Sequence, residues 1–181
     1  MGMLSVDVER IPGARTESGR LGELYVRHAD AAVRLGYLLT GDQALAEDLV
    51  QDAFVKLAGR LVHLRDPGAF DAYLRRTVVN LSNSYFRRRR VERAYLQRSR
   101  GLLEAQATVS GREHELADRD EVWTALQRVS SRQRAALVLR FYEDLSERQI
   151  ADVLNCRPGT VKSLISRGLE QLRQEIPGGE R

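Results

Sequence analysis

Cysteine is almost absent from this sequence of 181 residues, where Cys156 is the single example. One thiol excludes an internal disulfide and a zinc site built from a cysteine cluster. Aromatic residues make up only 6%, against 43% hydrophobic residues, which favours helices packed with Leu, Val and Ala over a β-sandwich. No run of 18 apolar residues occurs and no signal peptide is visible, so we expect a soluble, cytoplasmic protein without direct membrane insertion.

Lysine is scarce as well, with two residues against 27 arginines, and the net charge is only +4. The charge is unevenly spread, because "YFRRRRVERAYLQRSR" (85–100) holds seven Arg and one Glu. Such a run is typical of a solvated helix terminus, a nuclear-import-like patch or a phosphate-binding stripe. Amides, a hydroxyl and aromatic rings lie beside the charge, and they suit unstacked single-stranded bases: Asn80, Asn83, Ser84, Tyr85 and Phe86. Spacing alone does not decide between an ordinary solvated surface and a nucleic-acid site.

Apolar residues recur at helical spacing in a first block, 19–91, where three helices are expected to close one small core. Gly41 and Asp42 separate the first two helices, since Gly suits a helix C-terminus and Asp suits an N-cap. Pro67 is placed to start the third helix. Residues 1–18 lack periodicity, so we expect them to form a mobile tail.

A second helical block is expected over 115–176, after a linker at 92–114 where the pattern fades among Gly, Ser and mixed charges. The pattern leaves open whether this linker is partly helical. Residues 177–181 are expected to form a short tail. No segment alternates at period two for long enough to propose a strand. The sequence therefore predicts an all-α fold of two small helical domains joined by a flexible linker.

The end of the second block has the pattern of a helix-turn-helix. The S-x-x-Q motif at Ser146 is a capping box that opens one helix, and Ser130 begins a similar motif upstream. Asn155 tolerates the left-handed conformation of a tight turn, and Pro158 suits the first turn of a new helix. That helix presents short polar and cationic side chains that fit a DNA major groove: Thr160, Lys162, Ser163 and Arg167. A plain helical hairpin with a solvated face is the alternative that this pattern leaves open.

Three segments together resemble a known family: "YLLTGDQALAEDLVQDAF" (37–54), "YLRRTVVNLSNSYFRRRR" (73–90) and "SSRQRAALVLRFYEDLSERQIADVLNCRPGTVKSLISRGLEQLR" (130–173). They resemble a bacterial RNA polymerase sigma factor of group IV, the extracytoplasmic-function (ECF) type. The first two are similar to conserved regions 2.1 to 2.4, and the third is similar to region 4. The resemblance implies a promoter-specificity subunit for transcription initiation. Residues 19–91 would bind core polymerase and the −10 element, and residues 115–176 would read the −35 element as duplex.

The resemblance also implies partners. Core RNA polymerase would be contacted through its β′ clamp helices and its β flap, and promoter DNA would be the second partner. Many family members are held by an anti-sigma factor, and no residue here identifies one. No cofactor and no metal site are expected.

Residue roles follow from the same resemblance. The segment "AEDLVQDAF" matches the core-binding helix, which implies polymerase contacts at Asp48, Gln51, Asp52 and Phe54, although a polar helix face with one packed aromatic is the ordinary reading. Asn80 matches the Asn of the −10 reading segment, and the implied −10 set is Asn80, Asn83, Tyr85, Phe86, Arg87 and Arg88. The implied −35 set is Arg148, Arg157, Thr160, Lys162, Ser163 and Arg167.

The sequence departs from the family pattern at several positions. Ser130 stands where the family often has Pro, and Asn155 stands where it usually has Gly. Arg157 replaces the usual Ser before the recognition helix, so a cap is lost and a cation is gained. Leu164 replaces the usual Arg, which removes an expected DNA contact and leaves the −35 preference open.

Two other classes of function are alternatives to a sigma factor. A free-standing helix-turn-helix regulator usually dimerises on a palindrome and carries a sensing domain, whereas the first block here resembles region 2. A nucleic-acid enzyme would need a metal cluster, a P-loop or paired catalytic acids, and none appears with supporting context. The three histidines, His28, His63 and His114, lack ligand spacing. His28 lies on an apolar helix face, where a histidine is more often part of a core than a catalyst. The protein is therefore not expected to be an enzyme.

Overall fold

The structure, a computed structural model, describes residues 14–59, 67–100 and 120–176. Every element in these ranges is a helix: α1 (Ala14–Thr40), α2 (Gln43–Ala58), α3 (Pro67–Arg100), α4 (Asp120–Arg128), α5 (Ser131–Phe141), α6 (Glu147–Leu154) and α7 (Pro158–Glu175). The predicted all-α fold is confirmed. None of the described helices combines the length and hydropathy needed to cross a membrane.

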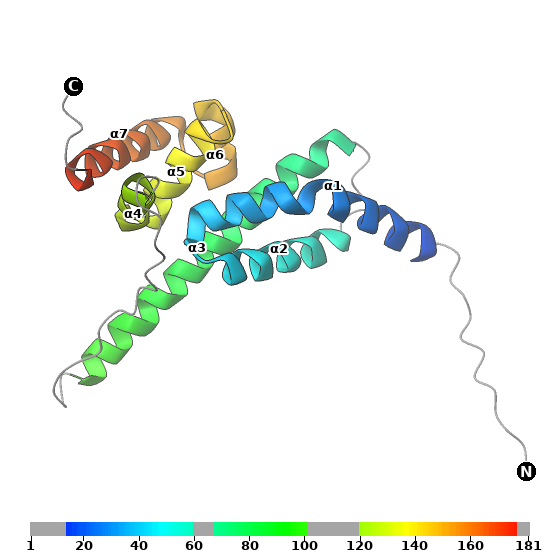
Figure 1. The fold of residues 1–181 in the computed structure, drawn as a ribbon, viewed down its shortest axis with the longest axis horizontal. Coiled ribbons are helices and arrows are strands. Elements are labelled where there is room, and N and C mark those ends of the chain that lie inside the picture. The colour runs from blue at the N-terminus through cyan, green and yellow to red at the C-terminus, as the bar shows by residue number, and fades with distance from the viewer. Residues whose placement is uncertain (1–13, 60–66, 101–119, 177–181) are drawn as a thin grey trace, which may run out of the picture.

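The first block consists of α1, α2 and α3 (Figure 1). Gly41 ends α1 in the left-handed region, with φ of 76°, which glycine adopts without strain. Asp42 then caps α2 by accepting a hydrogen bond from the backbone N–H of Leu45 at 3.1 Å, as predicted. This short turn folds α2 back along α1, and α3 packs against both. The core they enclose is built mainly from Leu35, Leu39, Val50, Ala53, Phe54, Leu57, Phe70, Leu74, Val78 and Val79.

The helices α1 and α2 approach each other closely where Gly36 faces Ala46. A Cβ at Gly36 would lie 3.1 Å from the Cβ of Ala46 and 3.3 Å from its Cα. No side-chain rotation can move these atoms away, because they belong to the backbone of α2 or are fixed directly to it. Small residues at both positions therefore set the separation of the two helices.

Two helices extend beyond the bounds predicted for the first block. The helix α3 begins at Pro67 as expected and runs to Arg100, so the predicted linker is helical over residues 92–100. No Gly or Pro occurs at positions 92–100, and Arg, Ala, Leu and Gln all favour a helix. Likewise α1 begins at Ala14, within the predicted tail 1–18, because Ala, Arg and Glu extend its first turns. The rest of the predicted linker and tails lies outside the described residues.

The second block, α4 to α7, contains the predicted helix-turn-helix. The hydroxyl of Ser146 accepts from the backbone N–H of Gln149, whose side chain accepts from the backbone N–H of Ser146, so the predicted capping box is present. Asn155 is left-handed, with φ 48° and ψ 58°, and Pro158 begins α7. The second predicted capping box is wrong, because the hydroxyl of Ser130 donates to the side chain of its Gln partner and caps no backbone N–H.

The two blocks lie against each other rather than apart (Figure 1). Tyr37 of α1 stacks on Trp123 of α4, with ring centroids 4.7 Å apart and planes 11° from parallel. Arg75 of α3 donates to the carboxylate of Glu143, which follows α5, at 2.5 Å. Buried apolar side chains of both blocks form one continuous cluster. Periodicity within each block carries no signal for this contact.

Gly22→Ala and Gly36→Ala, two identical substitutions in α1, should change stability in opposite directions. A Cβ at Gly22 meets nothing within 4 Å, so Ala should raise the free energy of unfolding by roughly 0.5–1 kcal/mol through its helix propensity. At Gly36 the contact with Ala46 should outweigh that gain and give a net loss of about 1 kcal/mol. Urea unfolding followed by circular dichroism measures both. Equal gains in the two variants would show that the helix crossing has room for a methyl group.

Candidate nucleic-acid interface

The exposed side of α7 carries several of the residues predicted to read duplex DNA. The opposite side is anchored by Val161, which is fully buried. It is also anchored by Gly168, where a Cβ would lie 2.9 Å from the side chain of Leu137. Four side chains on the exposed side line a shallow hollow of about 300 Å³: Lys162, Ser163, Ser166 and Arg167. The structure thus brings three predicted residues together and adds Ser166, whose signal is its position three residues after another lining serine.

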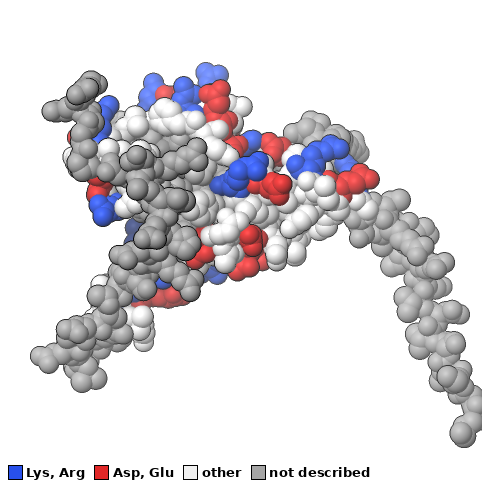
Figure 2. Space-filling view, viewed as in Figure 1, with Lys and Arg blue, Asp and Glu red and all other residues white. Residues whose placement is uncertain are grey.

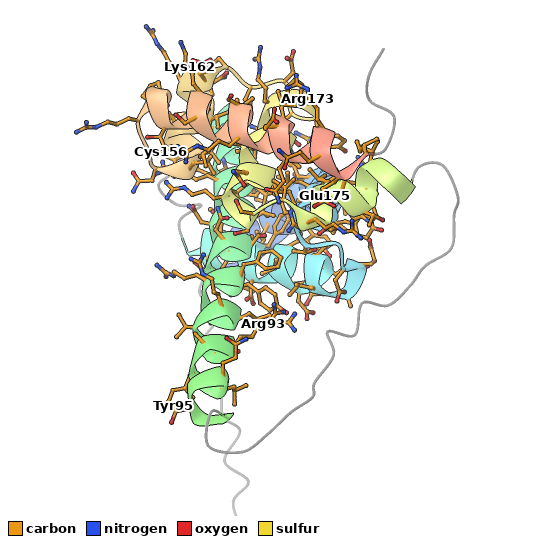
Figure 3. The ribbon with its side chains drawn as sticks, turned by 90° about the vertical axis from the view of Figure 1, so that its left-hand side faces the viewer. Arg93, Tyr95, Cys156, Lys162, Arg173 and Glu175 are labelled. Atoms are coloured by element: carbon orange, nitrogen blue, oxygen red, sulfur yellow. The ribbon has the colours of Figure 1, made fainter. Side chains whose placement is uncertain are left out.

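Two side chains of this hollow have partners within the protein. The hydroxyl of Ser163 donates to the backbone carbonyl of Gly159 at 3.1 Å. The ammonium of Lys162 lies 3.8 Å from the carboxylate of Glu147 in α6, and it points away from the body of the molecule (Figure 3). Figure 2 shows Lys and Arg side chains along the outer edge of the α6–α7 pair, with acidic side chains among them. The surface is therefore mixed in charge, with its cations outermost.

The remaining predicted −35 residues lie outside the hollow. Thr160, Arg148 and Arg157 are all exposed. Arg157 occupies the N-cap position of α7, and no side chain caps this helix start, as the departure from the family pattern predicts. Leu164 is half-buried and packs against the core, so this departure supports the packing of α7.

A larger groove of about 750 Å³ lies between α3 and the second block. Its α3 side is lined by Asn80, Asn83, Ser84, Phe86, Arg87 and Arg90. Its other side is lined by Ser130, Ser131, Arg132, Arg134, Leu154 and Asn155. The α3 residues recur mainly at intervals of three and four, which places them on one helix face. The structure therefore gathers four of the six predicted −10 residues in one groove and adds Ser84 and Arg90.

Tyr85 and Arg88 are the two predicted −10 residues that do not line the groove. The ring of Tyr85 meets Phe86 edge-on, with centroids 5.4 Å apart. Arg89 covers the face of Tyr85, its guanidinium carbon 5.7 Å from the ring centroid, and donates to the phenol oxygen at 3.1 Å. Arg88 is exposed. Beyond them α3 projects from the body of the protein and carries Tyr95 near its end (Figure 3).

The groove lining includes a buried cation, Arg134, which is only 5% exposed. Its guanidinium donates to the backbone carbonyls of Leu39 at 2.9 Å, Gln127 at 3.1 Å and Val129 at 3.3 Å, and to the side-chain oxygen of Gln127. Its central carbon lies 5.3 Å from the ring centroid of Phe86. Burial lowers the pKa of the Arg134 guanidinium to about 10, because the charged form loses its hydration. The group stays charged at neutral pH.

A third polar surface lies on α2. Asp48, Gln51 and Asp52 are exposed, and their spacing of three and four residues puts them on one side of the helix. Val55, which is 73% exposed, stands on the same side. Sequence reasoning misses this valine, although an apolar residue that interrupts a polar helix face is a signal for a contact surface.

Phe54 does not belong to that surface. It is 4% exposed, and its ring packs against Tyr25 and Phe70, with centroid distances of 4.9 Å and 5.8 Å. The motif match fixes the position of Phe54 along α2, but the helix turns its side chain into the core. The direct contact predicted for Phe54 is thus corrected to a packing role beneath the α2 surface.

No metal-ligating group of three His, Cys, Asp or Glu side chains occurs in the described ranges. His28 is half-buried, packs on the ring of Phe70 at 5.4 Å, and has its Nδ1 atom 3.6 Å from a carboxylate oxygen of Asp71. These contacts give His28 a packing role between α1 and α3.

Comparison with known proteins identifies both blocks. The family models Sigma-70 region 2 and Sigma-70, region 4 match residues 24–92 and 119–172. The RNA polymerase sigma-E factor of Streptomyces avermitilis is 36% identical over 85% of this chain and 84% of its own. The ECF RNA polymerase sigma factor SigE of Mycolicibacterium smegmatis is 36% identical over 85% of this chain and 60% of its own. The sigma factor RpoE from Bartonella quintana, solved in complex with the anti-sigma factor NepR, has a TM-score of 0.64 at 22% identity, covering 89% of this chain and 99% of that one.

Arg157→Ser should stabilise α7 and weaken DNA binding at the same time. Serine at the N-cap can accept from a free backbone N–H of the first turn, so we expect the free energy of unfolding to rise by about 1 kcal/mol. If Arg157 holds a phosphate, the slope of log affinity against log salt for duplex DNA should fall by about one unit. Urea unfolding and DNA titrations at several salt concentrations measure these effects. Arg173→Ser, which removes the same charge from the last turn of α7, is the control. Unchanged stability of Arg157→Ser would show that this helix start needs no cap.

Proposed function

The chain belongs to the sigma-70 family as an RNA polymerase sigma factor of the ECF group, and we propose that its three polar surfaces divide the work of promoter recognition. A sigma factor binds core RNA polymerase and promoter DNA and acts in transcription initiation. In this assignment α2 holds the polymerase, α3 opens and reads the −10 element, and α7 reads the −35 element. Since polymerase and chromosome share the bacterial cytoplasm, we place its work there.

The groove on α3 is the observation that carries the −10 assignment. Asn80 and Asn83 offer amide donors and acceptors that suit the Watson–Crick edge of a base. Phe86 offers a ring on which a base can stack, and Arg87 and Arg90 offer guanidinium groups for the phosphates of the same strand. One face of one helix therefore presents all three kinds of contact that a melted strand needs.

The exposed side of α7 supports the −35 assignment. A recognition helix enters the major groove with short polar side chains and cations at its surface. Lys162 and Arg167 supply the cations. The side chains of Ser163 and Ser166 are short, so they allow the helix to approach the base edges closely. Since Ser163 already donates to the backbone of α7, its hydroxyl meets DNA mainly as an acceptor.

The α2 surface supports docking on core polymerase. Its two carboxylates and one amide are exposed beside Val55, so an apolar contact is framed by groups that can pair with cations and amides of a partner. We assign this surface to the β′ clamp helices and the second block to the β flap. The relative from Bartonella quintana was solved with an anti-sigma factor, and we propose that a partner of this class also regulates the present chain.

A free-standing helix-turn-helix regulator is the alternative function, and the comparisons do not favour it. The region 2 model matches the first block, which in such a regulator would be a sensing domain. A pull-down separates the two, because a sigma factor binds core polymerase and an operator-binding regulator need not.

Replacing Asp48 and Gln51 together with Ala should weaken the affinity for core polymerase by about ten-fold or more, as expected for contacts near the centre of an interface. Both side chains are exposed, so the helix content should not change. Fluorescence titration of labelled protein with core polymerase measures the affinity. A matched variant, Asp30→Ala with Gln174→Ala, also removes one exposed carboxylate and one exposed amide, from α1 and α7. If both variants bind core polymerase as tightly as the parent chain, α2 is not the docking helix.

Asn80→Ala should impair promoter opening more than initial binding. Flipping a base costs a few kcal/mol and stacking returns about 1–3 kcal/mol. Because these two free energies nearly cancel, the loss of one side chain that contacts the base should make opening unfavourable. The variant holoenzyme should still form a closed complex through its −35 contacts and give less permanganate-reactive thymine near the start site. Run-off transcription should be partly restored on a template with a pre-melted bubble.

The rival role for Asn80 is packing or capping within α3. Because Asn80 is exposed, we expect thermal stability to be unchanged. A loss of thermal stability without rescue by the bubble, or full opening on duplex DNA, contradicts the assignment.

A further inference from the structure

The groove beside α3 concentrates positive charge. Of the twelve described residues that line it, four are arginines and none is an aspartate or a glutamate. Arg87 and Arg90 come from α3, and Arg132 and Arg134 come from α5, which lies against α3 (Figure 1). Among the residues that the structure describes, no carboxylate forms an ion pair with any of the four. Two pairs of like charges therefore share one groove without a counter-charge from the protein.

The charge of Arg134 is the least screened of the four. The side chain is 5% exposed, and salt screens a buried charge much less than an exposed one. Its acceptors are the carbonyl oxygens of Leu39, Gln127 and Val129 and the side-chain oxygen of Gln127, none of which carries a net charge. Its Nε atom is buried and has no partner among the described residues. The hydrogen bonds hold the guanidinium in place, but its positive charge stays uncompensated.

The start of α5 adds donors to the same groove. Ser130, Ser131 and Arg132 all line it. The hydroxyl of Ser130 donates to the side chain of Gln133, so no side chain caps the first turn of α5. The first backbone N–H groups of a helix have no partner within the helix and carry the positive end of its dipole, which is why helix starts bind phosphate. Uncapped donors thus lie beside the arginines.

We propose that this groove binds a chain of linked phosphates, carried by a nucleoside triphosphate or by inorganic polyphosphate. Guanidinium groups pair with phosphate oxygens in a bidentate geometry, and serine hydroxyls and helix N–H groups donate to the same oxygens. Linked phosphates bring several negative charges together, so one ligand can balance the cations of α3 and α5 at once. The groove volume of about 750 Å³ lies in the usual range for a small-molecule site.

The α3 side of the groove favours a nucleotide over an inorganic chain. Arg87 follows Asn80 by seven positions, and Arg90 follows Asn83 by the same interval. Seven residues are about two turns, or about 10 Å along the helix, and they return to the same face. The amides can therefore hydrogen-bond to a base while the arginines, farther along the same face, hold the phosphates of that molecule.

This site goes beyond the promoter functions proposed above. Arg132 and the start of α5 belong to none of the three surfaces assigned to polymerase, the −10 element and the −35 element. Arg87 and Arg90 are shared with the −10 surface, so a phosphate chain and a melted strand would compete for them. That competition alone rests on the proposed −10 function of α3.

Titration calorimetry of the full chain with ATP, and separately with inorganic triphosphate, tests the site in buffer without magnesium. We expect one ligand per chain. Arg132→Ala should weaken the binding of ATP about ten-fold through the loss of charge-assisted hydrogen bonds, and Arg132→Lys should restore only part of it, because an ammonium cannot pair bidentately. Arg76→Ala removes an exposed arginine of α3 that does not line the groove, and it should bind ATP as the parent chain does.

Ser130→Asp is an independent variant that cannot act through loss of folding. A carboxylate at the N-cap can accept from a free N–H of the first turn and interacts favourably with the helix dipole, so the melting temperature should rise. The same carboxylate occupies the donors and repels phosphate, so the affinity for ATP should fall about ten-fold. A purely structural role of Ser130 would change the melting temperature and leave the affinity as it is.

The two ligands distinguish the source of the phosphates. Tighter binding of ATP than of inorganic triphosphate identifies a nucleotide, and equal or tighter binding of the inorganic chain identifies polyphosphate. The proposal is overturned if neither ligand binds at a single site, or if Arg132→Ala and Ser130→Asp bind ATP as tightly as Arg76→Ala. Run-off transcription with core polymerase tests the sigma function separately. A chain that transcribes but binds neither ligand refutes the phosphate site alone, and a chain that binds ATP but neither binds polymerase nor transcribes refutes the proposed function alone.

Discussion

A buried guanidinium, that of Arg134, is the interaction on which the arrangement of the two blocks depends. A charge this deep is tolerated only where acceptors surround it, and here they come from Leu39 of α1, Gln127 of α4 and Val129 just after α4. The requirement ties the end of α1, the end of α4 and the start of α5 to one point in space. The face of the Phe86 ring covers the guanidinium on its remaining side, so Arg134 also shapes the proposed nucleic-acid groove.

The features that sequence could predict are those encoded in neighbouring residues. Gly41, Asp42, Ser146, Asn155 and Pro158 all take the roles that their own backbone and side-chain preferences predict. Such preferences act over a single turn of chain, and the wider fold leaves them unchanged. Family resemblance then supplied the order of the two blocks, which the comparisons confirm.

The sequence did not predict features that depend on the direction in which a side chain points or on contacts between residues far apart in the chain. Phe54 sits at the matched position, but only the packing of α1 and α3 shows that its ring points inward. Ser130 has the same motif as Ser146, yet its hydroxyl finds the Gln133 side chain instead of a backbone N–H. The stacking of Tyr37 on Trp123 joins residues that are far apart in the chain, and no periodicity within one block can reveal it.

A single unbroken helix, α3, carries both the packing residues of the first block and the groove residues that follow them. Phe70, Leu74 and Val78 are wedged among the side chains of α1 and α2, which fixes the rotation of α3 about its own axis. At 3.6 residues per turn, a residue inserted after Val79 would swing every later side chain by about 100°, including Leu81 and Ser82 beside the core, while Phe70, Leu74 and Val78 keep their places. The packing of the hydrophobic core thus fixes the direction in which the amides, the aromatic ring and the arginines of α3 face outward. In the proposed −10 function, exchanging side chains on this face of α3 would change the preferred bases, but the direction of the face can change only if the core is rebuilt.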